Sequence, residues 1–142
     1  MDTTCGTVLI NHKDQILVGH VTRQPYNIWA IPKGLHENNE SYREAALREF
    51  KEETNLSVEV QELVHVNELL RKPYHAVECF FEVKKTSGSE KLGKDPELSW
   101  DRQLLHDLQW MSINELPEID FAPSSLVEKI QHWDRRFNYP VF

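Results

Sequence analysis

The chain has 142 residues and a mass of 16.7 kDa, which predicts one domain spanning residues 1–142. It contains no apolar run of about 18 residues, so a membrane-spanning helix is excluded. Its 23 acidic residues outnumber its 16 Lys and Arg residues, and the net charge of −7 disfavours general nucleic-acid binding. Cys5 and Cys79 are too few and too far apart in sequence for a zinc motif or a disulfide framework. We expect a cytoplasmic monomer or homodimer without a signal peptide.

The first third of the chain predicts short strands. Apolar and β-branched residues over 5–10 and 15–21 favour two strands, and the polar residues between them favour a hairpin turn. Residues 29–31 favour a third strand, which Pro32 ends because proline cannot donate a ladder hydrogen bond.

The second half of the chain predicts a mixture of strands and short helices. Within a strand over 74–83, Glu78 interrupts one apolar face and fits equally an edge strand with a carboxylate facing water. Ser112 and Glu115 have the spacing of a capping box for a short helix ended by Pro117. The other expected elements are strands over 58–66 and 108–111, a loop over 86–99, and a final helix from Pro123 with Leu126, Ile130 and Trp133 on one side.

The most informative helix is predicted from Ser41 to Thr54. Ser41 and Glu44 form a capping box at its start, and Asn55 suits the left-handed position that follows a helix. The apolar side is predicted to comprise Ala46, Leu47 and Phe50.

Three glutamates occupy one turn of this helix, because Glu49, Glu52 and Glu53 have the spacing i, i+3 and i+4. One interpretation is a solvated acidic face that neighbouring cations such as Arg48 neutralise. The other is a site for a hard divalent cation, which prefers several carboxylate oxygens and keeps open positions for water and phosphate. Like charges at this spacing repel one another, so the second interpretation gives the cluster a purpose.

The spacing around the glutamates resembles a family signature. From Gly34 the chain reads glycine, five residues, Glu40, seven residues, and then Arg-Glu-Phe-Lys-Glu-Glu-Thr-Asn-Leu over residues 48–56. This resembles the signature of the Nudix hydrolase family (MutT-like), with Asn55 in place of a glycine. Residues 29–34 and 108–117 also resemble family elements. The resemblance implies an α/β/α sandwich, with a mixed sheet between helices and the signature forming a loop-helix-loop at the sheet edge.

The resemblance also implies an activity: hydrolysis of a nucleoside diphosphate linked to another moiety, with Mg²⁺ or Mn²⁺ as cofactor. Carried over by position, the metal ligands are the Gly34 carbonyl, Glu49, Glu52 and Glu53, and the ion lowers the pKa of a bound water. Arg48 orients the glutamates by ion pairing, and Glu40 is either a more distant ligand or a structural anchor. Glu52 is the first choice as general base; the candidates outside the signature are Glu78, Glu97, Asp101 and Asp107.

The substrate stays open at this point. Arg23 and Lys33 flank the predicted site and are either phosphate contacts or ordinary solvated cations. The resemblance leaves dinucleoside polyphosphates, oxidised nucleoside triphosphates and ADP-ribose as candidates, with a slight preference for the first from Tyr74 and Lys33. Residues 86–99 are predicted to close over the substrate. The alternatives are a nucleotide-sensing domain without catalysis and an acidic-helix interaction module. Trp29, Tyr74 and Trp100 either stack on a base or belong to the core.

Overall fold

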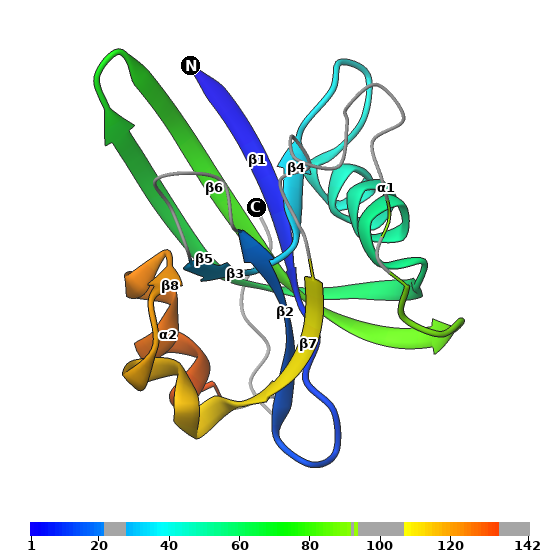
Figure 1. Cartoon of the computed structure of the whole chain (residues 1–142). Coiled ribbons are helices and arrows are strands. Elements are labelled where there is room, and N and C mark those ends of the chain that lie inside the picture. Colours follow the sequence, from blue (N-terminus) through cyan, green and yellow to red (C-terminus); the bar gives the residue numbers. More distant parts are fainter. Residues whose placement is uncertain (22–27, 92, 94–106, 134–142) are drawn as a thin grey trace.

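The computed structural model describes residues 1–21, 28–91, 93 and 107–133, and their strands form two mixed four-stranded sheets (Figure 1). The first sheet has the order β4-β1-β6-β5, with β1 parallel to β6. The second has the order β7-β2-β3-β8, with β3 parallel to β8. The strands are β1 (Asp2–Val8), β2 (Gln15–Val21), β3 (Ile28–Ala30), β4 (Lys33–Leu35), β5 (Ser57–Arg71), β6 (Tyr74–Ser87), β7 (Asp107–Ser112) and β8 (Phe121–Ala122).

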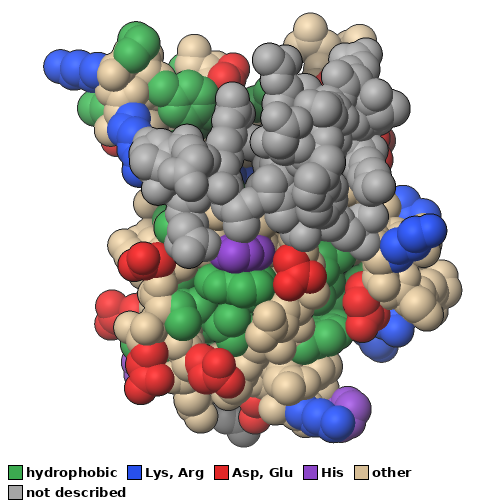
Figure 2. All heavy atoms as spheres, viewed as in Figure 1, with side chains coloured by type: hydrophobic (Ala, Val, Ile, Leu, Met, Phe, Trp, Pro, Cys, Tyr) green, Lys and Arg blue, Asp and Glu red, His purple; other side chains and the backbone are tan. Residues whose placement is uncertain are grey.

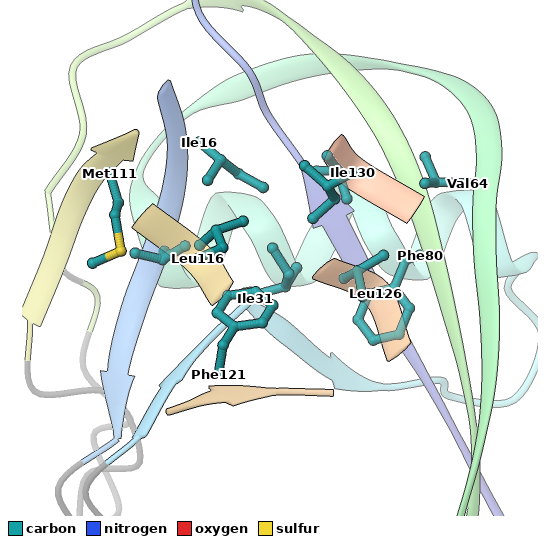
Figure 3. Close-up of a cluster of buried hydrophobic side chains, with 11 residues drawn as sticks. Ile16, Ile31, Val64, Phe80, Met111, Leu116, Phe121, Leu126 and Ile130 are labelled. Carbon is teal, nitrogen blue, oxygen red and sulfur yellow. The ribbon is translucent and has the colours of Figure 1, made fainter. Parts of the chain in front are cut away.

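Helices cover the two faces of the first sheet, which agrees with the expected mixed sheet between helices. Helix α1 (Tyr42–Thr54) packs on one face, and α2 (Ser124–Gln131) packs with the second sheet against the other (Figure 1). Successive residues of β6 point to opposite sides, so Phe81 contacts the α1 cluster while Phe80 enters the larger core shown in Figure 3. That core contains Val8, Ile16, Val18, Ile31, Val64, Phe80, Met111, Leu116, Phe121, Leu126 and Ile130.

The expected hairpin is present only at its turn. The Asn11 N–H donates to the Gln15 carbonyl over 2.9 Å, and the Leu17 N–H donates to the Leu9 carbonyl over 3.1 Å. Beyond this turn the strands separate, because β1 pairs with β4 and β6 while β2 pairs with β3 and β7. Sequence-adjacent strands thus contribute to different sheets.

Both ends of α1 form as predicted. The Ser41 side chain accepts from the Glu44 N–H, the Glu44 carboxylate accepts from the Ser41 N–H, and Asn55 adopts φ 65°. The predicted apolar side is displaced by one residue: Leu47 is exposed, whereas Ala45 and Thr54 join the buried residues. The displacement arises because α1 meets the sheet along the 46–50–54 line, which Ala45 flanks on the sheet side.

Several boundaries differ from the sequence-based expectation. Strand β5 extends to Arg71 and β6 to Ser87, so the pair forms one long hairpin and the first two residues of the expected 86–99 loop are strand. Strands β4 and β8, three and two residues long, were not predicted. Their sequences carry no period, and pairing with β1 and β3 is what makes them extended.

The expected short helix is a 3₁₀ helix, η2 (Ile113–Glu118), and its expected capping box is wrong. Ser112 makes no side-chain capping bond, because it is still paired with Gln15 as the last residue of β7. Pro117 lies inside the helix and does not end it. Burial of Leu116 in the core, rather than a regular hydrogen-bond ladder, holds this turn.

The two cysteines are distant in sequence but are register partners on β1 and β6. Both are buried free thiols beneath α1, and burial raises the pKa of Cys5 to about 12. No helix among the described residues has the length and apolar character to cross a bilayer.

Candidate functional site

Gly34 of β4 lies directly against Glu49 of α1. A Cβ added to Gly34 would lie 2.0 Å from both Cδ and Oε2 of Glu49. No side chain fits there unless the carboxylate moves. The register of β4 on β1 places Gly34 opposite Cys5. This pairing determines where along the sheet Gly34 meets the Glu49 side chain of α1.

We therefore expect Gly34→Ala to displace the Glu49 carboxylate while the protein stays folded, because β4 is an edge strand and the overpacked group is the end of one side chain. The expected result is at least a tenfold weaker Mn²⁺ affinity, measured by electron paramagnetic resonance of free Mn²⁺. Gly6→Ala is not a suitable control, because its Cβ would meet the Phe80 ring at 2.8 Å. An unchanged Mn²⁺ affinity in Gly34→Ala would place the cation elsewhere.

Arg48 connects the signature residues through its guanidinium. Nη1 donates to Oε1 of Glu49 over 2.8 Å and lies 3.4 Å from Oε2 of Glu52, and Nη2 donates to the Leu35 carbonyl over 3.0 Å. The side chain thus ties two helical glutamates to the end of β4. These bonds let Arg48 orient the carboxylates of the helix.

Glu40 anchors this guanidinium in a bidentate pair. Nε of Arg48 lies 3.1 Å from Oε2 of Glu40, and Nη2 lies 2.8 Å from Oε1, which also accepts the Glu37 N–H over 2.8 Å. The hydrogen bonds from Arg48 lower the pKa of Glu40 to about 2. Of the two roles considered for Glu40, this geometry favours the structural anchor.

Glu49 and Glu53 are the electrostatically costly pair of the helix. Burial raises the pKa of Glu49, and burial together with the charges of Glu49 and Glu52 raises the pKa of Glu53 well above its ordinary value. Lys33 opposes this rise only in part. Oε2 of Glu53 is enclosed and has no hydrogen-bond partner in the described part of the chain. A buried carboxylate oxygen without a donor is costly unless a ligand completes it.

The described residues do not hold a preassembled cage of three or more His, Cys, Asp or Glu side chains. The donors nevertheless fit a divalent cation: an orphaned Glu53 oxygen, a Glu49 carboxylate against a glycine backbone, and Glu52, whose side chain is 59% exposed. Hard oxygen donors with open positions are what Mg²⁺ and Mn²⁺ prefer.

The segment after β6 closes the carboxyl end of α1, a contact that the sequence did not indicate. The Lys91 N–H donates to the Thr54 carbonyl and the Gly93 N–H to the Glu53 carbonyl, both over 2.8 Å. A Cβ on Gly93 would lie 1.8 Å from the Glu52 carbonyl oxygen, so a glycine is required here. These contacts fix the backbone that carries Glu52 and Glu53. The residues of the predicted lid at 92 and 94–99 lie outside the described residues.

Lys33 and Glu78 form an ion pair beneath the site. Glu78 is 2% exposed on the central strand β6, so its interpretation as a water-facing edge carboxylate is wrong. Nδ2 of Asn67 donates to Oε1 of Glu78 over 2.8 Å, and the Ser125 hydroxyl donates to Oδ1 of Asn67 over 3.1 Å. Sequence reasoning missed Asn67 and Ser125, because only the pairing of β5 with β6 and the docking of α2 bring them together.

The remaining predicted residues are dispersed. Trp29 stacks on His20 with ring centroids 4.4 Å apart and also packs against the larger core. Tyr74 is 43% exposed where β6 begins, and Asp107 is exposed at the start of β7. The predicted residues Arg23, Glu97, Trp100 and Asp101 lie outside the described residues.

Sequence and structure comparisons identify relatives. The chain is 42% identical over 59 residues to an RNA pyrophosphohydrolase of Cereibacter sphaeroides, a match covering 42% of this chain and about a third (36%) of that relative's length. It is 27% identical over 128 residues to an ADP-ribose pyrophosphatase of Methanocaldococcus jannaschii, covering 88% of this chain and 70% of that protein. A NUDIX hydrolase structure from Nitrosomonas europaea superposes with a TM-score of 0.75 at 21% identity, covering 99% and 93% of the two chains.

The likeness of the solved structure supports the fold, and the family itself follows from the sequence. The NUDIX domain profile matches residues 2–133, which include the glutamate helix, both sheets and α2. The Gly34–Glu49 contact and the Arg48 network lie inside this match. The chain therefore belongs to the NUDIX family.

Proposed function

We propose that the protein is a metal-dependent pyrophosphohydrolase that cleaves a phosphoric anhydride in a nucleoside diphosphate derivative. The single observation that carries the proposal is the enclosed, donorless Oε2 of Glu53 next to Glu49 and Glu52. A chain that needed only a stable helix would avoid this repulsion. A nucleotide sensor without catalysis has no need for it either.

The chain's own residues supply binding and orientation. Glu49, Glu52, Glu53 and the Gly34 carbonyl would hold Mg²⁺ or Mn²⁺, which neutralises the diphosphate and lowers the pKa of bound water when present. Arg48 fixes the carboxylate of Glu49 through the 2.8 Å bond, and Glu40 fixes Arg48 in turn. These bonds hold the Glu49 side chain in one rotamer, so the acidic turn (Glu49, Glu52 and Glu53) is ordered before a metal or substrate binds.

Glu52 is the proposed general base. It is the most exposed of the three glutamates on the turn, and Arg48 approaches it only to 3.4 Å, so one carboxylate oxygen stays accessible to water. Glu78 is a poorer candidate, because Lys33 and Asn67 already occupy its two oxygens. The described outside candidate Asp107 accepts the Leu108 N–H at the start of β7.

The substrate is proposed to be a small nucleotide, with a preference for dinucleoside polyphosphates. Lys33 would contact phosphate, and Tyr74 would meet a distal nucleoside. Lys33 lies two strands across from Phe80, and Tyr74 lies six residues along β6 from Phe80, so the two backbone positions are more than about 20 Å apart. Only an extended substrate spans that distance. Acidic side chains spread over the described face in Figure 2, which suits a cation-bridged small substrate better than a polyanion.

The proposal is tested by incubating the protein with a panel of dinucleoside polyphosphates, oxidised nucleoside triphosphates, ADP-ribose and 5′-triphosphate RNA. The products are identified by mass, with Mg²⁺ or with EDTA. We expect Mg²⁺-dependent release of a nucleoside monophosphate from at least one dinucleotide. Hydrolysis of no compound, or equal hydrolysis in EDTA, would overturn the proposal.

A further inference from the structure

The buried Glu78 carboxylate is more elaborate than the fold requires. Ala76 and Phe80, its neighbours on the same face of β6, are apolar and buried. An apolar residue between them would avoid desolvating a charge, and replacing a buried ion pair by well-packed apolar residues is often neutral or stabilising. The presence of the pair therefore calls for a reason other than stability.

A chain of polar groups holds Glu78 in one orientation. Asn67 donates to one oxygen, and its own carbonyl oxygen accepts from Ser125, which lies 2.9 Å from Nε2 of His65. These contacts settle which way the Asn67 amide faces. Among the residues that the structure describes, the other oxygen of Glu78 has one partner, the ammonium of Lys33.

Lys33 connects these hydrogen-bonded polar groups to the site of the proposed hydrolysis. It directly precedes Gly34, and its charge acts on Glu53. Its side chain crosses β1 at Gly6, where a Cβ would lie 3.2 Å from Cβ of Lys33. The side chain remains 31% exposed, and an ammonium has three donors, of which the described part of the chain engages one, through Glu78.

We propose that Glu78 is a positioning residue. Together with Asn67 it fixes the Lys33 ammonium, so that the remaining N–H groups of Lys33 donate to a phosphate oxygen of the substrate. The proposal rests on the proposed function, because it assigns Lys33 to a nucleoside diphosphate bound at the acidic turn. A long lysine side chain has many rotamers, and Glu78 removes that freedom before the substrate arrives.

The test compares KM, kcat and the Kd for ADP in Ca²⁺, measured by calorimetry. Glu78→Gln is expected to raise KM and Kd about tenfold, the value of one charge-assisted contact, with kcat changed less than twofold. Lys33→Met is expected to raise both by a similar factor. Glu78→Asp keeps the charge, so it is expected to fold, and to raise both values about threefold because its carboxylate is one methylene shorter.

Two further variants separate positioning from stability. Lys33→Met/Glu78→Leu replaces the pair by apolar groups; its melting temperature is expected to fall only by what the lost acceptor of Asn67 costs, while KM stays as high as in Lys33→Met. Glu82→Gln changes a partly buried glutamate on the same face of β6, which bonds Trp133, and should leave KM and Kd unchanged.

The outcomes distinguish this inference from the proposed function. Wild-type KM and Kd in both Glu78→Gln and Glu78→Asp would overturn the positioning role even if the wild type hydrolyses nucleotides. Recovery of wild-type KM in the double variant would do the same. ADP binding that depends on Glu78, without hydrolysis of any substrate, would support the inference and reject the hydrolase. Absence of ADP binding in the wild type would overturn the inference, and only its combination with absence of hydrolysis across the panel would overturn both.

Discussion

Glu52→Gln is expected to lower kcat by about 10²–10⁴-fold, the range for loss of a positioned general base. The amide keeps the size of the side chain and its position beside Arg48, so the protein should stay folded, and Mg²⁺ is kept saturating because Glu52 is also a proposed metal ligand. The measurement is steady-state hydrolysis of the substrate identified in the panel, with thermal unfolding of the same preparations.

The matched control for this variant is Glu59→Gln, which removes the same charge from an exposed position on β5. It should retain wild-type kcat. If Glu52→Gln retains wild-type turnover, Glu52 does not act as the base, and another glutamate of the signature or an acid outside it takes that role. If both variants lose activity, the effect is one of net charge.

Glu53→Gln is expected to stabilise the metal-free protein by about 1 kcal/mol, which corresponds to roughly 3 °C in melting temperature. Burial and two like charges raise the pKa of Glu53. Protonated Glu53 therefore stabilises the fold at low pH, and this contribution is lost as pH rises through the raised folded-state pKa. The uncharged amide removes that loss, so the variant's stability should depend less on pH.

The same variant should respond less to metal. An ion at 100 times its Kd stabilises a protein by about 2.7 kcal/mol, so Mg²⁺ is expected to raise the wild-type melting temperature clearly. Glu53→Gln lacks one carboxylate ligand and should show a smaller rise, measured by scanning fluorimetry in EDTA and in Mg²⁺. Equal Mg²⁺ shifts, or a variant that melts below the wild type in EDTA, would contradict a cation held by Glu53.

The glutamate helix shows how far local sequence reaches. Its first residue, capping box and left-handed Asn55 all depend on groups within four positions of one another, and all form as predicted. The side that α1 buries was off by one residue at Leu47, because the sheet and not the helix chooses the contact line. Tertiary pairing also overrides local sequence at η2. Ser112 has the spacing of a capping residue, but it pairs with Gln15 as part of β7 and does not cap the helix.

The sequence by itself determined the family and the spacing of Gly34, Arg48 and the three glutamates. These residues lie in one continuous segment that comprises β4, a loop and α1, so their spacing can be read along the chain. Tertiary structure alone decided what surrounds them. It placed Glu78 in the interior, brought Asn67 and Ser125 to it, and set Gly93 against the backbone of Glu52. These groups lie between 11 and 58 residues apart, and only sheet register and helix docking, which depend on burial of the whole core, bring them into contact.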